Sequence, residues 1–220
     1  MTFSILARDA SDGSFGGAAA TGSLCVGGWV LRGDSRVGLS ASQGASPSTL
    51  WGEDVLERMR AGAAATKAVA DITQADSGRA WRQLAAIGTE GDGAAFTGAS
   101  NTPWHGSLAA PGVIVAGNML AGPKVLDAIL SGFRSKQGPW PDRLLAALAA
   151  GQTAGGDVRG LQSAALLVVS DRSAPLTLRI DWSQDPIVAL GQLVSRTREP
   201  GYADWFETVP TRKDPERGHD

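Results

Sequence analysis

The first 21 residues carry the pattern that most restricts how this chain can fold. Residues 3–8 have the composition of a β-strand, with Phe3 and Ile5 on one face. Turn-forming residues follow at 9–13, and residues 14–21 form a second strand pattern made largely of glycine and alanine. Together these segments predict an N-terminal β-hairpin. The small side chains of its second strand would let another layer of structure pack close to the backbone.

Strand and helix patterns alternate in blocks along the rest of the chain. We expect strands at 24–31, 36–42, 84–88, 94–98, 113–116, 161–169 and 176–181, and helices that begin near Trp51, Thr66, Pro123, Pro141 and Pro186. This order predicts an α+β fold in which two antiparallel sheets lie face to face and the helices lie outside. We expect one domain over residues 1–197 and a polar C-terminal tail over residues 198–220.

Composition and charge exclude several classes of function. A net charge of −2 gives no electrostatic basis for binding nucleic acid or an anionic membrane, and the purely apolar runs, such as 164–169, are too short to span a bilayer. We therefore expect no nucleic acid and no membrane among the partners. Cys25 is the single cysteine, which rules out an internal disulfide and fits a reducing compartment. No signal-peptide pattern opens the chain, so we expect a cytoplasmic protein.

Thr2 is the first candidate for chemistry. A small residue after the initiator methionine permits removal of Met1, which would leave a threonine with its hydroxyl and a free amine close together. A hydroxyl needs a positioned base to become a nucleophile, and a terminal amine with a pKa of about 7.7–8.0 can serve as that base. The simpler interpretation is that Thr2 only begins a strand, and the pattern by itself favours that interpretation.

The common catalytic and cofactor motifs are absent from the sequence. There is no GxSxG elbow, no P-loop, and no GxGxxG after a strand. His105 and His219 are the only histidines, so a His/Cys metal cluster cannot be assembled, and we expect no metal and no cofactor. His105 is a possible general base, but a loop histidine without an identified partner is more often a surface or packing residue. Cys25 is expected to be an inert strand residue.

Two polar corners lie where a strand meets a helix. Residues 40–46 contain Gly44, and the backbone N–H groups around it can form an oxyanion hole or simply belong to a polar loop. Residues 117–123 contain Asn118, which can donate a hydrogen bond to a developing negative charge or only satisfy the turn.

A third polar cluster spans residues 155–163, just before a buried strand. A surface salt bridge between Asp157 and Arg159 would explain both residues without any function. Gln162 and Ser163 are harder to explain, because at least one of them should point inward and need a partner. A terminal ammonium group or a threonine hydroxyl would be such a partner.

Several segments together resemble a known family. They are residues 2–9 (TFSILARD), the loop at Trp104, residues 117–123 (GNMLAGP) and residues 155–166 (GGDVRGLQSAAL). From Thr2 to about Val194 the chain is similar to the domain-of-unknown-function 1028 (DUF1028) family. The resemblance implies the N-terminal nucleophile (Ntn) hydrolase-like fold, a four-layer αββα sandwich, which agrees with the order of elements derived above.

A more distant similarity is to proteasome-type β subunits. It implies that Thr2, Gly44, Asn118, Asp157 and Ser163 correspond to the nucleophile and the groups around it. Those enzymes carry an acid in the second strand and a lysine beside the nucleophile, and this sequence has neither. An arginine at position 8, 32 or 36 could supply positive charge in place of the lysine. The candidate catalytic residues are Thr2, Asn118, Asp157 and Ser163, and the candidate oxyanion or substrate-binding residues are Gln43, Gly44, Gln162 and Arg159.

Two classes of function follow. The first is an Ntn-type amidohydrolase in which Thr2 attacks a small-molecule amide. The second is a catalytically inactive relative that binds a small ligand in the same cleft or scaffolds a partner enzyme. The missing acid and lysine favour the second, the polar corners favour the first, and we adopt the first. We also expect a homo-oligomer, a dimer, with a partner surface at Trp29, Trp51, Trp140 or Trp205.

Overall fold

The predicted N-terminal hairpin forms, and it lies at the centre of the larger of two sheets. The structure, a computed structural model, describes residues 2–218. Strand β1 (Thr2–Arg8) pairs antiparallel with β2 (Phe15–Thr21) on one side and with β8 (Val113–Asn118) on the other. The full order of this sheet is β10-β9-β2-β1-β8-β7, completed by β7 (Gly106–Ala110), β9 (Ser163–Val169) and β10 (Leu176–Ile180).

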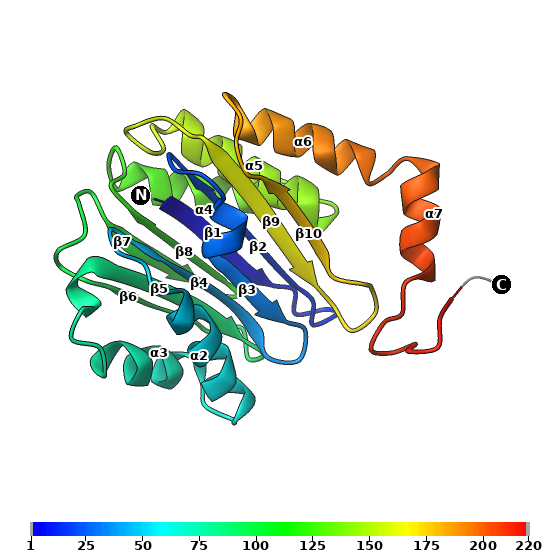
Figure 1. Ribbon diagram of the computed structural model, residues 1–220, viewed down its shortest axis with the longest axis horizontal. Coiled ribbons are helices and arrows are strands. Elements are labelled where there is room, and N and C mark those ends of the chain that lie inside the picture. Colours follow the sequence, from blue (N-terminus) through cyan, green and yellow to red (C-terminus); the bar gives the residue numbers. More distant parts are fainter. Residues whose placement is uncertain (1, 219–220) are drawn as a thin grey trace.

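A second antiparallel sheet stacks on one face of the first. Its order is β3-β4-β5-β6, with β3 (Leu31–Asp34), β4 (Gly38–Gly44), β5 (Arg82–Gly88) and β6 (Gly93–Thr97). Helices α2 (Thr49–Arg60) and α3 (Ala65–Gln74) cover its outer face (Figure 1). Helices α4 (Lys124–Ser135), α5 (Trp140–Thr153) and α6 (Pro186–Arg196) cover the outer face of the larger sheet. The four-layer αββα arrangement is therefore confirmed.

The side chains of β1 alternate between two apolar layers. Phe3 and Ile5 pack beneath α4 and α5, whereas Leu6 faces the second sheet, where it joins Leu39 and Ile87. Because successive residues of a strand point to opposite faces, Thr2 lies on the same face as Leu6. The first residue of β1 therefore points into the space between the sheets.

The glycines of β2 allow the layers on both faces of the larger sheet to pack close to its backbone, as the sequence predicted. A Cβ atom on Gly16 would lie 2.3 Å from the ring of Trp140, the first residue of α5. On the other face, a Cβ atom on Gly17 would lie 3.1 Å from Leu39 Cδ1 of the second sheet. A larger residue at position 16 would collide with the indole ring, so the spacing between layers depends on these small residues.

The expected strand at residues 24–31 is wrong over most of its length. Cys25 adopts a left-handed conformation with φ 60°, and α1 (Val26–Trp29) follows it before β3 begins at Leu31. This turn of helix packs against the larger sheet, because a Cβ atom on Gly27 would lie 2.7 Å from Ala165 Cβ. Cys25 is thus a corner residue and not a strand residue. The Val-Gly-Gly-Trp segment carries no helical periodicity, so the sequence gives no signal for this helix.

The structure also contains elements that the sequence patterns missed. They are β7, the short 3-10 helix η1 (Arg79–Trp81) and α7 (Pro200–Thr208), which lies beyond α6 in the C-terminal segment (Figure 1).

Of the four tryptophans proposed as a partner surface, two are buried or half-buried. Trp51 lies on α2, is 4% exposed and packs in the apolar core, so it cannot form a partner surface. Trp140 is half-buried and stacks on Phe133. Trp29 and Trp205 are about half exposed and stay candidates for contact with a second copy.

Asp34 connects the β3–β4 turn to two distant segments. Its carboxylate lies 3.0 Å from Arg60 Nη2 on α2 and 3.6 Å from Arg212 Nη2 in the C-terminal segment. Burial alone would raise the pKa of the Asp34 carboxyl. The backbone N–H of Arg36, the Arg60 side chain and the charge of Arg212 more than offset burial, so the pKa is below its usual value.

This cluster gives a pH-dependent prediction. A depressed pKa in the folded state stabilises the fold above the unfolded pKa of about 3.9, and this stabilisation is lost as the pH falls through the folded value. We expect Asp34→Asn to lower the Tm at pH 7 by about 2–4 °C, equivalent to about 1 kcal/mol. The difference from wild type should shrink as the pH falls below the unfolded pKa of about 3.9 and through the lower folded value. Thermal unfolding across a pH series measures it. The exposed Asp54→Asn is the control and should match wild type throughout; a deficit for Asp34→Asn that persists in acid would contradict the assignment.

Candidate functional site

A polar layer closes one end of the apolar space between the two sheets. Six strands each contribute one side chain to it: Thr2 from β1, Thr21 from β2, Gln43 from β4, Gln83 from β5, Asn118 from β8 and Ser163 from β9. On five of these strands the residue two positions away is an alanine of the inter-sheet core, so these side chains face inward. All six residues are at most 6% exposed.

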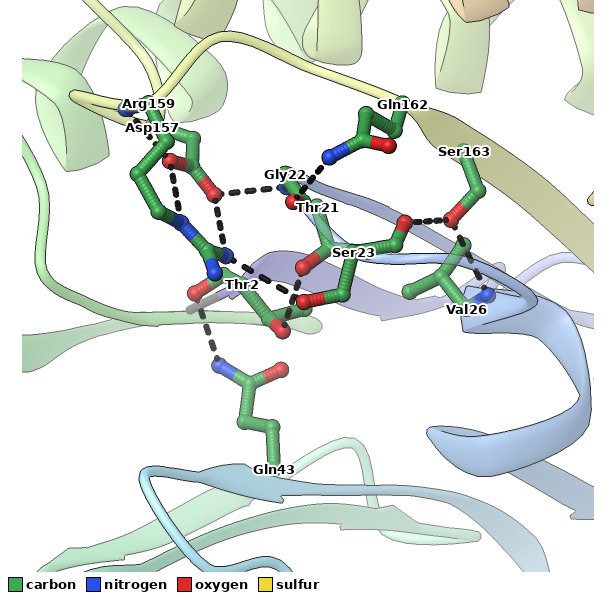
Figure 2. Close-up of polar contacts among 10 residues, drawn as sticks. All are labelled: Thr2, Thr21, Gly22, Ser23, Val26, Gln43, Asp157, Arg159, Gln162 and Ser163. Carbon is green, nitrogen blue, oxygen red and sulfur yellow. Dashed lines mark hydrogen bonds and ion pairs between the residues drawn. The ribbon is translucent and has the colours of Figure 1, made fainter. Parts of the chain in front are cut away.

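Four members of the polar layer form a row across the larger sheet. Thr2 is opposite Asn118 on β8, and Thr21 is opposite Ser163 on β9. The Thr2 hydroxyl donates a hydrogen bond to Thr21 Oγ1 at 3.2 Å (Figure 2). The central pairing of β1 therefore places the Thr2 hydroxyl in the middle of a row of hydroxyl and amide groups.

Gln83 connects the second sheet to this row. Its side-chain nitrogen donates to Thr97 Oγ1 at 2.8 Å, to Gly106 O at 3.1 Å and to Gly117 O at 2.9 Å. Its side-chain oxygen accepts from Gln43 Nε2 at 2.7 Å and from Asn118 Nδ2 at 3.1 Å. These partners fix the orientation of the Gln83 amide, because its nitrogen is surrounded by acceptors.

The orientation of Gln83 in turn leaves the side-chain oxygen of Gln43 without a hydrogen-bond partner in the described part of the chain. Gln43 Nε2 must face Gln83 Oε1, and it also lies 3.4 Å from the carbonyl oxygen of Thr2. Gln43 Oε1 is buried and has no hydrogen-bond partner among the described residues. A buried acceptor without a partner costs about 1–3 kcal/mol, so this oxygen is poised to accept an N–H group.

Asp157 lies in the loop between α5 and β9 and is fully buried. Its Oδ2 accepts from the backbone N–H of Gly22 at 2.6 Å, and its Oδ1 accepts from the backbone N–H of Arg159 at 2.8 Å. The Arg159 side chain binds the same carboxylate, with Nη2 at 3.1 Å from Oδ2 (Figure 2). The predicted salt bridge between Asp157 and Arg159 therefore forms, but it is not a surface pair, because the Asp157 side chain is 0% exposed.

Gln162 and Ser163 both hold the segment that follows β2. Ser163 Oγ donates to Ser23 O at 2.7 Å and accepts from Val26 N at 3.1 Å, and Gln162 Nε2 donates to Gly22 O at 2.8 Å (Figure 2). Ser163 does point inward, as expected. Its bonds go to the backbone of residues 23–26 instead of to a terminal ammonium group or a threonine hydroxyl.

Gly44 contributes less to the site than the sequence suggested. Its φ of 131° requires glycine, and a Cβ atom there would lie 2.7 Å from Trp81 O. The two N–H groups after it are already engaged: Ala45 N donates to Asn101 Oδ1 at 2.9 Å, and Ser46 N donates to Trp81 O at 3.0 Å. These two groups are not available to an oxyanion. Asn118 and Gln43 are the predicted residues that the structure brings next to Thr2.

The positive charge near the start of β1 comes from Arg159. The expectation of an arginine at position 8, 32 or 36 is wrong. Arg8 is at the far end of β1, Arg32 pairs with Glu53 on α2, and Arg36 lies in the β3–β4 turn. In Figure 2 the Arg159 side chain extends from its loop toward the start of β1.

Sequence reasoning missed Thr21 and Gln83, which are central to the polar layer. The available signal was weak: Thr21 is one polar residue at the end of a strand of small residues, and Gln83 follows the charged Arg82 at the start of its strand. Met1 and His219 lie outside the described residues. Among residues 2–218 there is no group of three or more His, Cys, Asp or Glu side chains that could hold a metal ion. No helix in that same span is long and apolar enough to cross a bilayer.

The sequence matches the family model of DUF1028, a family of unknown function, over residues 2–190. The chain belongs to the DUF1028 family. A crystal structure of a DUF1028 protein from Silicibacter pomeroyi is 51% identical, with a TM-score of 0.95, and the match covers 100% of this chain and 99% of that one. The search of solved structures also found HslV from Trypanosoma brucei, at 14% identity and a TM-score of 0.48, covering 76% of this chain and 99% of HslV. No protein of curated function matched this DUF1028 chain.

The polar layer gives a prediction about stability. Gln83→Leu would leave the acceptors and donors around the amide without partners in a buried position, so we expect a loss of about 2–3 kcal/mol and a Tm lower by more than about 4 °C. Gln74→Leu, at the exposed end of α3, is the matched control and should change the Tm little. Chemical and thermal unfolding measure both variants. A Gln83→Leu protein as stable as wild type would show that the network contributes little.

Proposed function

We propose that this DUF1028 protein hydrolyses a small-molecule amide, with Thr2 as the nucleophile once removal of Met1 has made it the first residue. The observation that carries the proposal is the position of the Thr2 side chain. It is buried in the polar layer, in the middle of the larger sheet, and its hydroxyl is held by Thr21 Oγ1. If Thr2 only began a strand, the polar layer formed with side chains of five other strands would have no purpose.

The chemistry uses groups that belong to one residue. The free amine of Thr2 takes the proton of its own hydroxyl, and Oγ1 attacks the carbonyl carbon of the amide. The tetrahedral intermediate collapses when the amine returns that proton to the leaving nitrogen, which leaves an ester on Oγ1. Water, deprotonated by the same amine, then releases the carboxylic acid and regenerates Thr2.

The polar layer supplies the groups that would orient the substrate. Asn118 has a second amide hydrogen beyond the one bonded to Gln83 and is placed opposite Thr2, so it is our candidate donor to the oxyanion. Gln43 Oε1 is our candidate acceptor for the N–H of the substrate amide. Asp157 and Arg159 hold the end of β2 by way of Gly22 and Ser23, so we assign them a positioning role.

A second candidate function is ligand binding without turnover. It is favoured by the charge pattern, because β2 contributes no acid and Arg159 is already neutralised by Asp157. In that case the same polar layer would bind an amide-bearing ligand and release it unchanged. The two functions differ only in whether Thr2 acts chemically.

The first test concerns the N-terminus. We expect the intact mass of protein purified without a tag to lack one methionine. Protein released from a cleavable fusion so that Thr2 is the first residue should turn over a member of a panel of small amides. The same protein with Met1 retained should be inactive, because its amine is in a peptide bond. Full retention of Met1 in cells would leave only the binding function.

The second test concerns the Thr2 hydroxyl. We expect Thr2→Ala to reduce turnover to the uncatalysed background while lowering the Tm by no more than about 4 °C, since it removes about one hydrogen bond. Thr2→Ser keeps a hydroxyl and should retain measurable activity. Turnover of the wild type should rise with pH through the amine pKa, near 7.7–8.0, and then level off. Equal activity in wild type and Thr2→Ala would remove Thr2 from the mechanism.

A further inference from the structure

The end of the sandwich opposite Thr2 contains a cavity of about 390 Å³. Hairpin turns of both sheets and the C-terminal segment surround it. Its charged lining consists of Arg8, Arg36, Arg172 and Lys213, against Asp12 and Asp171. Four cations and two carboxylates give a formal excess of two positive charges. Because β1 runs from Thr2 to Arg8, about 20 Å separates this cavity from the polar layer.

Arg8 lies deepest among these cations, at the end of β1. The residue is partly buried, and its Nε is buried with no hydrogen-bond partner in the described part of the chain. The Arg8 guanidinium forms no ion pair within 4 Å with any residue from 2 to 218. A partly desolvated guanidinium without a paired anion is costly, so the Arg8 charge favours an anion in the cavity that the residue lines.

The other cations are also available. Arg172 and Lys213 form no ion pair within 4 Å among the described residues, and Arg36 is loosely paired with Asp34 at 3.7 Å while 58% of its side chain is exposed. These three side chains come from the β3–β4 turn, the β9–β10 turn and the C-terminal segment. They can therefore converge on one ligand from three directions.

The carboxylates of the lining are occupied by other partners. Asp12 Oδ1 accepts from the backbone N–H and the hydroxyl of Ser14, at 2.8 and 2.5 Å. Asp171 Oδ1 accepts from Ser35 Oγ at 2.6 Å and lies 3.8 Å from Arg212. Neither carboxylate forms an ion pair within 4 Å with Arg8, Arg172 or Lys213, so these three cations line the cavity without a paired carboxylate among the described residues.

We propose that this cavity binds a small anion that carries phosphate or carboxylate groups. Guanidinium and ammonium groups are the usual ligands of such anions, and the volume suits a small metabolite. Binding would join the C-terminal segment to the hairpin turns through Lys213. The site is separate from the polar layer and does not depend on the proposed hydrolytic activity.

The test is a calorimetric titration of the full-length protein with two probes, inorganic pyrophosphate and citrate. We expect saturable binding at one site. Tighter binding of pyrophosphate would assign the ligand to phosphate compounds, and tighter binding of citrate would assign it to polycarboxylates. Arg8→Gln should weaken binding at least about tenfold, because it removes a charged donor from a desolvated position. Thr2→Ala should bind both probes as wild type does.

Matched variants keep the proposal falsifiable. Arg172→Gln changes an exposed residue that the fold does not need, and it should weaken binding measurably even if Arg8→Gln proves unstable. Lys136→Gln removes the same charge from the end of α4, outside the cavity lining, and should bind like wild type. The proposal is overturned if neither probe binds saturably, if Arg172→Gln binds like wild type, or if Lys136→Gln weakens binding as much as Arg172→Gln.

Discussion

The fold depends on the pairing of β1 with a neighbour on each side. Residues near the end of a chain are often poorly ordered unless other elements hold them, and here β2 and β8 both pair with β1 over most of its length. Leu6 is paired on both sides, and Thr2, which pairs with Asn118 of β8, takes its register from the same strand. The alternation of side chains then decides which residues meet α4 and α5 and which meet the second sheet.

The inter-sheet space changes character along the strands. Its middle is filled by small and branched apolar side chains such as Ala19, Ala85 and Ile87, and one end is filled by the polar layer. The Gln83 amide makes five hydrogen bonds at this end: two to Gln43 and Thr97 within its own sheet, and three to β7 and β8 of the larger sheet. A hydrogen-bonded layer of this kind can exclude bulk water while keeping a few groups, such as Gln43 Oε1, available to a ligand.

The sequence predicted the elements better than it predicted the contacts of the site. The hairpin, the amphipathic helix from Pro123 and the αββα order all follow from local periodicity, and the structure contains them. The sequence did not predict α1, because its Gly27 allows close packing against β9, and such a tertiary contact leaves no local pattern in the sequence. For the same reason the buried state of Asp157 was not foreseen: its partner, the N–H of Gly22, lies 135 residues away in the chain. Gln83 holds the polar layer together by donating to acceptors on three other strands, and the residues next to it in the sequence give no indication of these contacts.

The close approach at Gly16 couples two distant positions in any variant of this protein. The indole ring of Trp140 occupies the space in which a side chain at position 16 would lie, so even a methyl group there would overlap the ring. Neither position can be enlarged by itself without moving α5 away from the sheet. Homologues that carry a bulkier residue at the glycine position should therefore carry a smaller one in place of the tryptophan, so that the two sites change together.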